Sequence, residues 1–344
     1  MKFVIISKDR ACQADALIRS IRRFENLSKP EIYVIYNAST EIYAQGYVRL
    51  NIIHHNIRRV NGESSVKVIN DCGNIRTQLK HIMDYMDDTT CLLTDDCLFF
   101  RNPDVCTNYI GRELKNNHNL YSFSYRLGLN TVVQDYIRNI EQPKIQHYKE
   151  LDDSNTILYN YKHFHPETNY GLHFGWDGMC YETKILRGIF KLSDISHYIT
   201  NSHAIYPQQV ENFKARQREQ EKKELMACNK HSSLICMNYN STHPHAPFNS
   251  YPLELLNDKF LNGYQINLNS IDFSNINSCH QNFKFDFEKI NEEYLVSDIV
   301  PVLAPNPFAS FRGIISGAVA QSGRPIRMPD YDDLGEGLGE DLDD

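Results

Sequence analysis

Two adjacent carboxylates, Asp95 and Asp96, stand between a short apolar run that ends at Leu93 and a second one that begins at Cys97. The carboxyl ends of strands are where α/β sheets open crevices for ligands. Neighbouring anions repel and a buried unpaired carboxylate is costly, so the pair needs a cation, an arginine or water beside it. A divalent metal that carries a phosphate meets this need. The structural alternative is a loop that ends a strand with two solvated aspartates.

Metal chemistry suits such a pair, because Mg²⁺ and Mn²⁺ bind through one or two carboxylates together with substrate phosphates. Arg10, or Arg76 ahead of the aspartates, could add hydrogen-bond donors to those phosphates, although each is equally ordinary as a surface charge. The expected strands are not followed by a glycine-rich phosphate loop of either common type. This argues against a Rossmann dehydrogenase and against a P-loop NTPase.

A second concentrated stretch, residues 163–184, places the only tryptophan, Trp176, beside Asp177. Aromatic faces are good platforms for sugar rings, and a neighbouring carboxylate can accept the proton of an attacking hydroxyl. Glu182 is a second carboxylate in the same stretch. The structural alternative is a turn in which Trp176 anchors the loop and Asp177 caps a helix over residues 178–187.

A histidine pair, His243 and His245, lies in a polar loop further along the chain. The spacing recurs among metal ligands, and histidine is a common metal ligand. The chain has 14 histidines, so such pairs also arise by chance, and solvated loop histidines are the alternative. We take His243 as the candidate metal ligand of the pair.

The elements that must position these residues follow from apolar periodicity. The amino-terminal half predicts strands over residues 1–6, 30–36, 48–54 and 66–69, and a further one before Asp95. Helical spacing predicts helices after Arg10, between residues 74 and 86, and over 253–261. Asn37 ends the second strand, where its amide can reach a base or a ribose. This alternation predicts an α/β domain with a largely parallel sheet.

These residues resemble the nucleotide-sugar-dependent glycosyltransferases of the GT-A fold, related to family 2. The resemblance rests on residues 7–13, 34–37 and 92–96 and covers the segment 1–105. It implies a Rossmann-like, mostly parallel central sheet with flanking helices, and an α+β portion on the acceptor side. In such enzymes an Asp-X-Asp motif holds Mn²⁺ or Mg²⁺ against the diphosphate of a sugar donor. Here Cys97 takes the third position, so the motif departs from the common form.

The resemblance also implies a role for each candidate residue. It assigns Asp96 and His243 to the metal and Asp177 to the general base, with Glu182 as the second choice. Asp95 is expected to face the ribose or the sugar. The residues expected to bind the nucleotide sugar are Ser7, Asp9, Arg10, Asn37, Arg76 and Asp95. The implied reaction is metal-dependent transfer of a sugar, with inversion, from a nucleotide-diphosphate donor to a hydroxyl of a glycan, lipid-linked or protein acceptor. Retention stays open as the alternative stereochemistry.

The charge distribution divides the chain. Residues 321–344 carry two arginines against eight acids, a charge of −6 out of the total of −7, so the remaining residues are near −1. We expect a nucleotide-sugar-binding half over 1–105, an acceptor-binding and catalytic half over 106–320, and a disordered acidic tail over 321–344. The body carries no basic stripe with interleaved aromatic residues, so nucleic acid is not an expected partner.

The cysteine content and the hydropathy indicate the cellular compartment in which we expect the protein. The nine cysteines include no Cys-X-X-Cys pair, which is typical of reduced thiols in an intracellular protein. The amino terminus begins with a strand pattern rather than a secretion signal, and no apolar run approaches the length of a membrane span. We therefore expect a cytoplasmic protein without a transmembrane segment.

Two other classes of function remain open. One is a metal-dependent hydrolase of phosphoester or sugar-nucleotide substrates, in which the two aspartates, His243 and His245 hold ions that activate water. The other is a non-catalytic binding protein that keeps the nucleotide-sugar fold, for which the unusual Cys97 is the hint. The hydrolase predicts donor cleavage without an acceptor, whereas the binding protein predicts that Asp96→Ala leaves the biological role intact.

Overall fold

The structure is a computed structural model. It describes residues 1–27, 30–62, 65–72, 75–84, 89–135, 139–151, 155–191, 221–237 and 251–295. They belong to a compact unit that spans Met1–Val302, and a second unit, Leu303–Asp344, lies outside the described residues. The predicted acidic tail therefore lies outside them too. The halves expected on either side of residue 105 stay a prediction. Among the described helices, none combines the length and the hydropathy that a membrane crossing requires.

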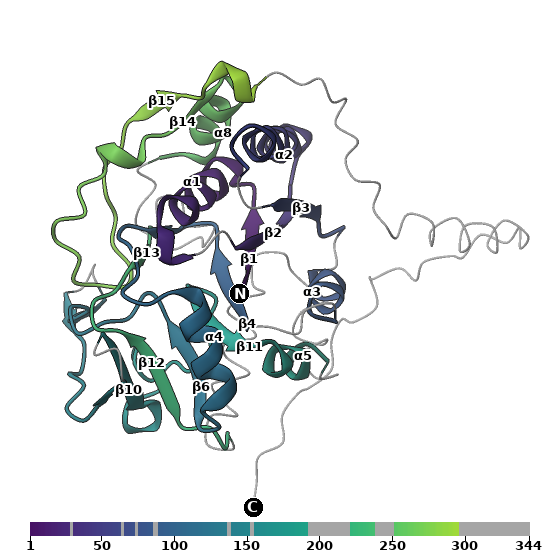
Figure 1. Cartoon of the computed structure of the whole chain (residues 1–344). Coiled ribbons are helices and arrows are strands. Elements are labelled where there is room, and N and C mark those ends of the chain that lie inside the picture. Colours follow the sequence, from purple (N-terminus) through teal and green to yellow (C-terminus); the bar gives the residue numbers. More distant parts are fainter. Residues whose placement is uncertain are drawn as a thin grey trace, which may run out of the picture. The chain divides into compact units, whose positions relative to one another are not determined.

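The amino-terminal half of the sheet is parallel. Its order is β3-β2-β1-β4, and each neighbouring pair runs in the same direction. Helices connect these strands, as the sequence predicts for an α/β fold (Figure 1). The bounds are β1 Lys2–Lys8, α1 Ala11–Arg23, β2 Glu31–Asn37, α2 Glu41–Asn61, β3 Val66–Asn70, α3 Ile75–Asp84 and β4 Thr89–Thr94. The expected α/β class is confirmed.

The strand expected over residues 48–54 is wrong, because these residues lie in the middle of α2. Tyr43, Tyr47, Leu50 and Ile53 are buried at helical spacing, so the apolar stretch is one face of a helix rather than a strand. The helix ends at Gly62, whose φ of 65° is the left-handed conformation that glycine adopts without strain.

The second half of the sheet is mixed. β11 lies antiparallel between β4 and β6, and β12 then pairs parallel with β6. The antiparallel strands β10 and β9 complete the order β3-β2-β1-β4-β11-β6-β12-β10-β9. The bounds are α4 Thr107–Asn116, β6 Leu120–Ser124, β9 Lys149–Glu150, β10 Thr156–Asn160, β11 Met179–Glu182, α5 Thr183–Lys191 and β12 Leu225–Asn229.

Short elements surround this sheet. β5 pairs with β13, β7 with β8 and β14 with β15, each in a two-stranded antiparallel ladder. The bounds are β5 Cys97–Phe99, β7 Val133–Asp135, β8 Ile140–Glu141, β13 Leu234–Cys236, α8 Leu253–Leu261, β14 Tyr264–Ile266 and β15 Phe287–Lys289. The short 3₁₀ turns are Glu25–Leu27, Tyr161–His163, Leu268–Ser270 and Glu292–Tyr294. The helix predicted over 253–261 is α8, which packs against α1 and α2.

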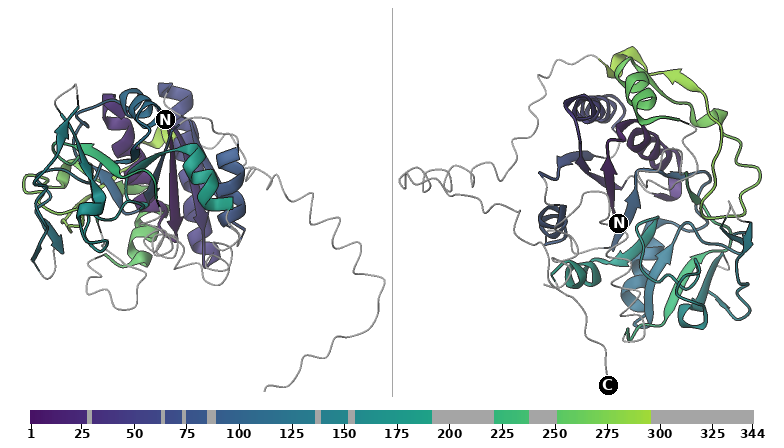
Figure 2. Two further views of the ribbon diagram at one scale, coloured as in Figure 1. Left: turned by 90° about the horizontal axis from the view of Figure 1, so that it is seen from below. Right: turned by 180° about the vertical axis from the view of Figure 1, so that it is seen from behind.

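Two apolar cores, one on each face of the sheet, hold the fold together. Alternate side chains of β1 serve different cores: Phe3 and Ile5 join the cluster under α1 and α2, whereas Val4 joins the cluster of α3 and α5. Helices therefore cover both faces of the parallel strands (Figure 2). With both faces covered, the polar ends of β1, β2 and β4 are where this part of the sheet can meet a ligand.

Candidate functional site

The loop between β1 and α1 is hydrogen-bonded to the end of the neighbouring parallel strand, β2. Asp9 adopts a φ of 60°, a left-handed conformation that aspartate tolerates better than most residues. Its backbone N–H donates to the Asn37 carbonyl at 3.1 Å, and its carboxylate accepts from the backbone N–H of Ser39 at 2.6 Å. Asn37 in turn donates from its amide to Asp71 at 2.9 Å. Asp9 and Asn37, both predicted to bind the donor, thus lie together at one edge of the sheet.

Asp95 is buried and supports this loop. Its carboxylate accepts hydrogen bonds from the Ser7 hydroxyl at 2.8 Å, the Lys8 backbone N–H at 3.1 Å and the Arg10 guanidinium at 3.1 Å. Tyr47 adds a second anchor, because its hydroxyl lies 2.6 Å from Ser7 Oγ and accepts from the Arg10 backbone N–H at 3.0 Å. Burial raises the pKa of Asp95 to about 6, and the neighbouring Arg10 charge opposes this rise. A contact of Asp95 with ribose or sugar stays a prediction.

Asp96 has a different environment from its neighbour. Its Oδ1 atom is buried without a hydrogen-bond partner, while its backbone carbonyl accepts from the Met237 N–H at 2.8 Å. Burial raises the pKa of the carboxyl, Arg10 lowers it, and the nearby Asp177 charge raises it further. A cavity of about 10 Å³, enough for one water molecule, borders Asp96. Its lining residues are Gln13, Ala16, Asp95, Asp96, Leu98, Met237 and Ile266.

Asp177 lies at the same end of β4. Gly178, with a φ of 76°, donates its N–H to the Leu92 carbonyl at 2.9 Å, which holds the preceding Asp177 beside Thr94. The Asp177 carboxylate accepts from the Thr94 hydroxyl at 2.9 Å and from the Arg126 guanidinium at 2.8 Å. It is 20% exposed, whereas Arg126 is 2% exposed. A reachable carboxylate is thus held on two sides by fixed donors.

The sugar platform expected of Trp176 is wrong, and so is the helix cap that the structural alternative gave to Asp177. Asp177 does not cap a helix, because the next residues form β11 and the helix α5 begins only at Thr183. Trp176 offers no platform to a sugar, because it is 1% exposed and packs against Phe174 and Phe190. The tryptophan anchors the turn from inside the core, which is the structural role weighed for it above.

Glu182, the second choice for the base, lies elsewhere. The register of β11 against β4 pairs Met179 with Leu92 and Glu182 with Thr89, at the opposite end of β4 from the aspartates. Its carboxylate forms ion pairs with Lys184 and Lys223. Arg76 lies in α3, but its side chain is outside the described part of the chain, and so are His243 and His245. The roles predicted for Arg76 and His243 stay predictions.

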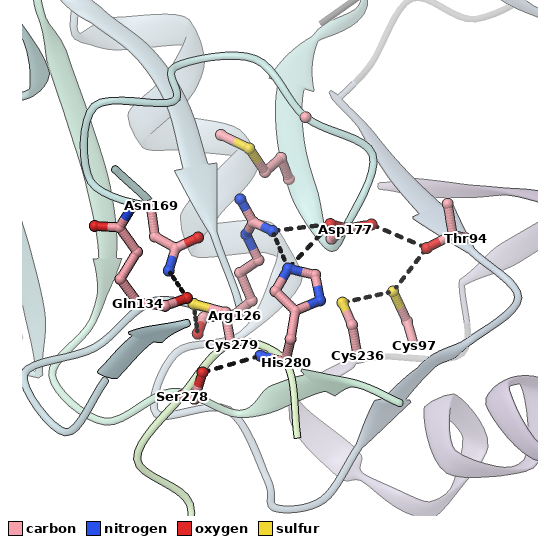
Figure 3. A network of polar contacts seen from close by, with 12 residues as sticks. Thr94, Cys97, Arg126, Gln134, Asn169, Asp177, Cys236, Ser278, Cys279 and His280 are labelled. Atoms are coloured by element: carbon pink, nitrogen blue, oxygen red, sulfur yellow. Dashed lines mark hydrogen bonds and ion pairs between the residues drawn. The ribbon is translucent and has the colours of Figure 1, made fainter. Parts of the chain in front are cut away.

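The sequence reasoning missed Arg126 and His280. His280 Nε2 lies 3.9 Å from Asp177 and 3.3 Å from Arg126, and Figure 3 shows the imidazole facing both of these side chains. Backbone hydrogen bonds fix the segment: the N–H of Cys236 donates to the Cys279 carbonyl, and the N–H of Gln281 donates to the Cys236 carbonyl. Both missed residues come from loops distant in sequence, so no local spacing signals them.

The thiols of Cys97 and Cys236 lie next to Asp177. The Sγ atoms of Cys97 and Cys236 are 3.5 Å apart, and the Thr94 hydroxyl lies 3.3 Å from Cys97 Sγ (Figure 3). Burial is the largest cause that raises the pKa of each thiol, and the nearby Asp96 and Asp177 charges add to the rise. Both groups are therefore neutral thiols at ordinary pH.

The donor set around Asp96 fits a hard divalent cation. A buried carboxylate oxygen without a hydrogen bond is costly, and a cation is one partner that would satisfy it. The Asp177 carboxylate and the His280 imidazole, whose charges act on the Asp96 carboxyl, are also groups that Mn²⁺ accepts, but among the described residues these three do not bring their ligand atoms within 4.8 Å of one another. The Asp-Asp-Cys sequence thus contains two kinds of potential ligand. Its second aspartate offers a carboxylate oxygen, whereas Cys97 lies against another thiol.

Comparison with protein-family models gives no match, and no curated protein matches the sequence. The matching solved structures include S. aureus TarS 1–349, with 10% identity, a TM-score of 0.38, and 68% of this chain and 59% of that chain covered. They include a further structure of S. aureus TarS, with 12% identity, a TM-score of 0.35, and 61% and 33% covered. The apo structure of WbbM, a bifunctional glycosyltransferase, has 13% identity, a TM-score of 0.33, and 62% and 37% covered. The chain thus spans less than two thirds of each structure. At TM-scores this low, these structures say nothing about the reaction of this chain, which has to be inferred from the residues of its own site.

Proposed function

We propose that this chain is a metal-dependent glycosyltransferase. The observation that carries the proposal is that Asp96 and Asp177 both lie at the carboxyl end of β4, near enough for the Asp177 charge to act on the Asp96 carboxyl, beside the polar ends of β1 and β2. One of these carboxylates has a buried oxygen without a hydrogen bond, and the other is 20% exposed and held by Thr94 and Arg126. A ligand-holding anion next to a reachable, oriented carboxylate is what transfer to a hydroxyl requires.

The donor is expected at the ends of β1 and β2. Arg10 is the positive charge beside both Asp95 and Asp96, and α1 begins directly after it. A guanidinium and the amino terminus of a helix both favour phosphate oxygens. Asp9 and Asn37, at the neighbouring strand ends, would bind the ribose or the base. Asp95 would act indirectly, because it holds Ser7 and Arg10 in place.

Asp96 would hold Mn²⁺ or Mg²⁺ through its unsatisfied carboxylate oxygen, with His243 as the further candidate ligand. The ion would neutralise charge on the departing nucleoside diphosphate. Asp177 would take the proton of the acceptor hydroxyl through a lone pair that its bonds to Thr94 and Arg126 leave available. The hydroxyl oxygen would form the new bond to the anomeric carbon as the bond to the diphosphate breaks, with inversion. The acceptor would be a glycan, a lipid-linked sugar or a protein.

The experiment is calorimetric titration of UDP, GDP, CDP and their sugars into the protein, with and without Mn²⁺. We expect one nucleotide to bind in a Mn²⁺-dependent manner, at least about tenfold more weakly to Asp96→Ala, because a charged metal contact of 1.4 kcal/mol or more is lost. Glu182→Gln is the matched control, since this carboxylate lies at the other end of β4, and it should bind as the wild type does.

Product formation then separates the classes of function. Asp177→Asn should bind the nucleotide but lose transfer by about 10²-fold or more, as expected for removal of a general base. Donor cleavage that needs no acceptor would favour the hydrolase instead. Failure of every nucleotide to bind the folded wild-type protein would contradict the transferase proposal.

A further inference from the structure

Two thiols and the carboxylate of the proposed base form a cluster of potential metal ligands. Cys97 Sγ, Cys236 Sγ and a carboxylate oxygen of Asp177 all lie within 4.8 Å of one another. The two cysteines are 0% and 1% exposed, and their sulfurs are 3.5 Å apart. Three segments far apart in the sequence thus bring three potential ligand atoms to one point.

The backbone fixes all three positions. β5 and β13 pair in a register that sets Cys97 directly opposite Cys236. The Met237 N–H, next to Cys236, donates to the Asp96 carbonyl, which ties the two cysteine segments together again. Asp177 is held through the hydrogen bond from Gly178 to Leu92. A cation would therefore find the ligands already in place and would cost little reorganisation.

We propose that Cys97, Cys236 and Asp177 form a binding site for a thiophilic divalent cation, with Zn²⁺ as the expected occupant. Tetrahedral Zn²⁺ with Zn–S bonds of about 2.3 Å separates two sulfurs by about 3.8 Å, near the spacing of this pair. Two thiolates and one carboxylate are ligands that Zn²⁺ accepts, and the fourth position is left for water. Mg²⁺ and Mn²⁺ prefer oxygen ligands, so this site differs in chemistry from that of Asp96.

Charge balance supports the assignment. Before the ion binds, the thiols are neutral and Asp177 is paired with Arg126. Zn²⁺ would displace one proton from each thiol, and its two positive charges would balance the two thiolates, while Arg126 would continue to balance Asp177. The bound cluster would carry no net charge, which is the arrangement that a buried site tolerates best. Arg126, 2.8 Å from the carboxylate, would orient the ligand from behind.

The two sites share Asp177, which has a functional consequence. A carboxylate that ligates Zn²⁺ is less available to accept a proton, so Zn²⁺ should inhibit the transfer proposed above. This consequence rests on the proposed function. The binding of the ion itself does not, because it needs neither a nucleotide nor an acceptor.

The test is Cd²⁺ titration of the full reduced chain, followed by the ultraviolet thiolate-to-metal charge-transfer band, with Zn²⁺ competing for the site. We expect a band that saturates at one equivalent, is displaced by Zn²⁺, and is absent from the double variant Cys97→Ser, Cys236→Ser. The matched control is Cys91→Ser, Cys180→Ser. These thiols also face each other, across β4 and β11, but among the described residues they join no cluster with a third ligand. The control should keep the band.

The pH dependence and one further variant complete the test. Since two protons leave, the affinity for Zn²⁺ should rise by about 100-fold per pH unit below the thiol pKa values. Asp177→Asn should keep the band but weaken binding by about tenfold or more, which provides a readout even if the double cysteine variant does not fold. Absence of the band, its equal loss in both double variants, or unchanged affinity in Asp177→Asn would overturn the proposal. Each of these results leaves the transferase proposal untouched.

Discussion

Asp95 and Asp96 are adjacent in sequence and lie in two contrasting networks. The Asp95 network, made with Ser7, Lys8, Arg10 and Tyr47, supplies its carboxylate with three hydrogen bonds, of which the one from Arg10 is also an ion pair. On the other side, Asp96 leaves one buried oxygen without a hydrogen bond and faces the charge of Asp177. The same residue type, one position apart, is thus fully hydrogen-bonded in one case and left with an unsatisfied buried oxygen in the other.

The contrast indicates that the two aspartates have different roles. A satisfied carboxylate fixes the loop between β1 and α1, and an unsatisfied one is retained next to it although it lowers stability. Natural proteins keep such unfavourable groups mainly where function needs them. Asp96 is therefore the better candidate for a ligand contact, although both aspartates are equally prominent in the sequence.

The largest expected effect on stability comes from removing the Asp95 carboxylate, which holds the loop between β1 and α1. Asp95→Ala should lower the free energy of unfolding by about 3–5 kcal/mol at neutral pH, because it breaks a buried ion pair with Arg10 and removes the acceptor of the Ser7 hydroxyl. Asp96→Ala should change it by less than about 1 kcal/mol or raise it, because the loss of a hydrogen bond with the half-buried Thr94 is offset by removal of a buried oxygen that has no hydrogen bond. Urea unfolding of both variants gives the two values. Equal losses would remove the distinction between the two networks.

The next effect is on the pH dependence of stability. Burial raises the pKa of Asp95 from 3.8 to about 6 in the folded protein. The folded state therefore binds the proton more tightly than the unfolded state, so this contribution is complete below about pH 4 and is lost as the pH rises through 6. On the order of 3 kcal/mol should disappear between pH 4 and 7. Asp95→Asn should flatten the curve in urea unfolding across this range, and an unchanged slope would contradict the assignment.

A smaller effect is expected from removing a single hydroxyl, either that of Tyr47 beside Asp95 or that of Thr94 beside Asp177. Tyr47→Phe removes a buried group that contacts Ser7 and accepts from the Arg10 N–H, which should cost about 1–2 kcal/mol. Thr94→Val removes a single donor to Asp177, which water can replace because this carboxylate is 20% exposed, so about 0.5–1 kcal/mol is expected. Thermal or urea unfolding measures both, and a larger loss for Thr94→Val would reverse the comparison.

The smallest effect concerns the thiols. Cys72 is exposed and Cys106 is half-buried, whereas the other seven cysteines are buried. In the native protein a thiol reagent should modify Cys72 rapidly and Cys106 more slowly, while Cys97 and Cys236 react only after unfolding, because burial raises the pKa of both. Mass spectrometry of the labelled peptides measures this order. Early labelling of Cys97 would show that the cluster of Cys97, Cys236 and Asp177 is open to solvent.

The sequence predicts the parallel half of the sheet because its strands are short apolar runs, each followed by a polar loop. It misassigns residues 48–54, because a short apolar run has the same composition in a strand and in one face of α2. The turn at Asp177 is misread for a related reason. The residues after it form a strand of four residues, and its pairing with β4 is set by contacts distant in sequence.

The candidate site is only partly readable from sequence. The two aspartates are visible because they are adjacent and follow an apolar run. That Asp95 is satisfied and Asp96 is not depends on Tyr47, Ser7 and Arg10, whose contacts only the folded chain defines. Arg126 and His280 reach Asp177 from two loops, and neither carries a local pattern that marks it.

The position of β11 has a consequence for synthesis of the chain. This strand lies between β4 and β6, so β4 keeps one unpaired, apolar edge until β11 is made. At about 5–20 residues per second, the interval between Thr94 and Met179 lasts on the order of 4–17 s. A nascent chain thus exposes the middle of its sheet to chaperones and to other chains during that time. The strand that ends this exposure also brings Asp177 to Thr94, so closing the sheet and completing the carboxylate pair are one event.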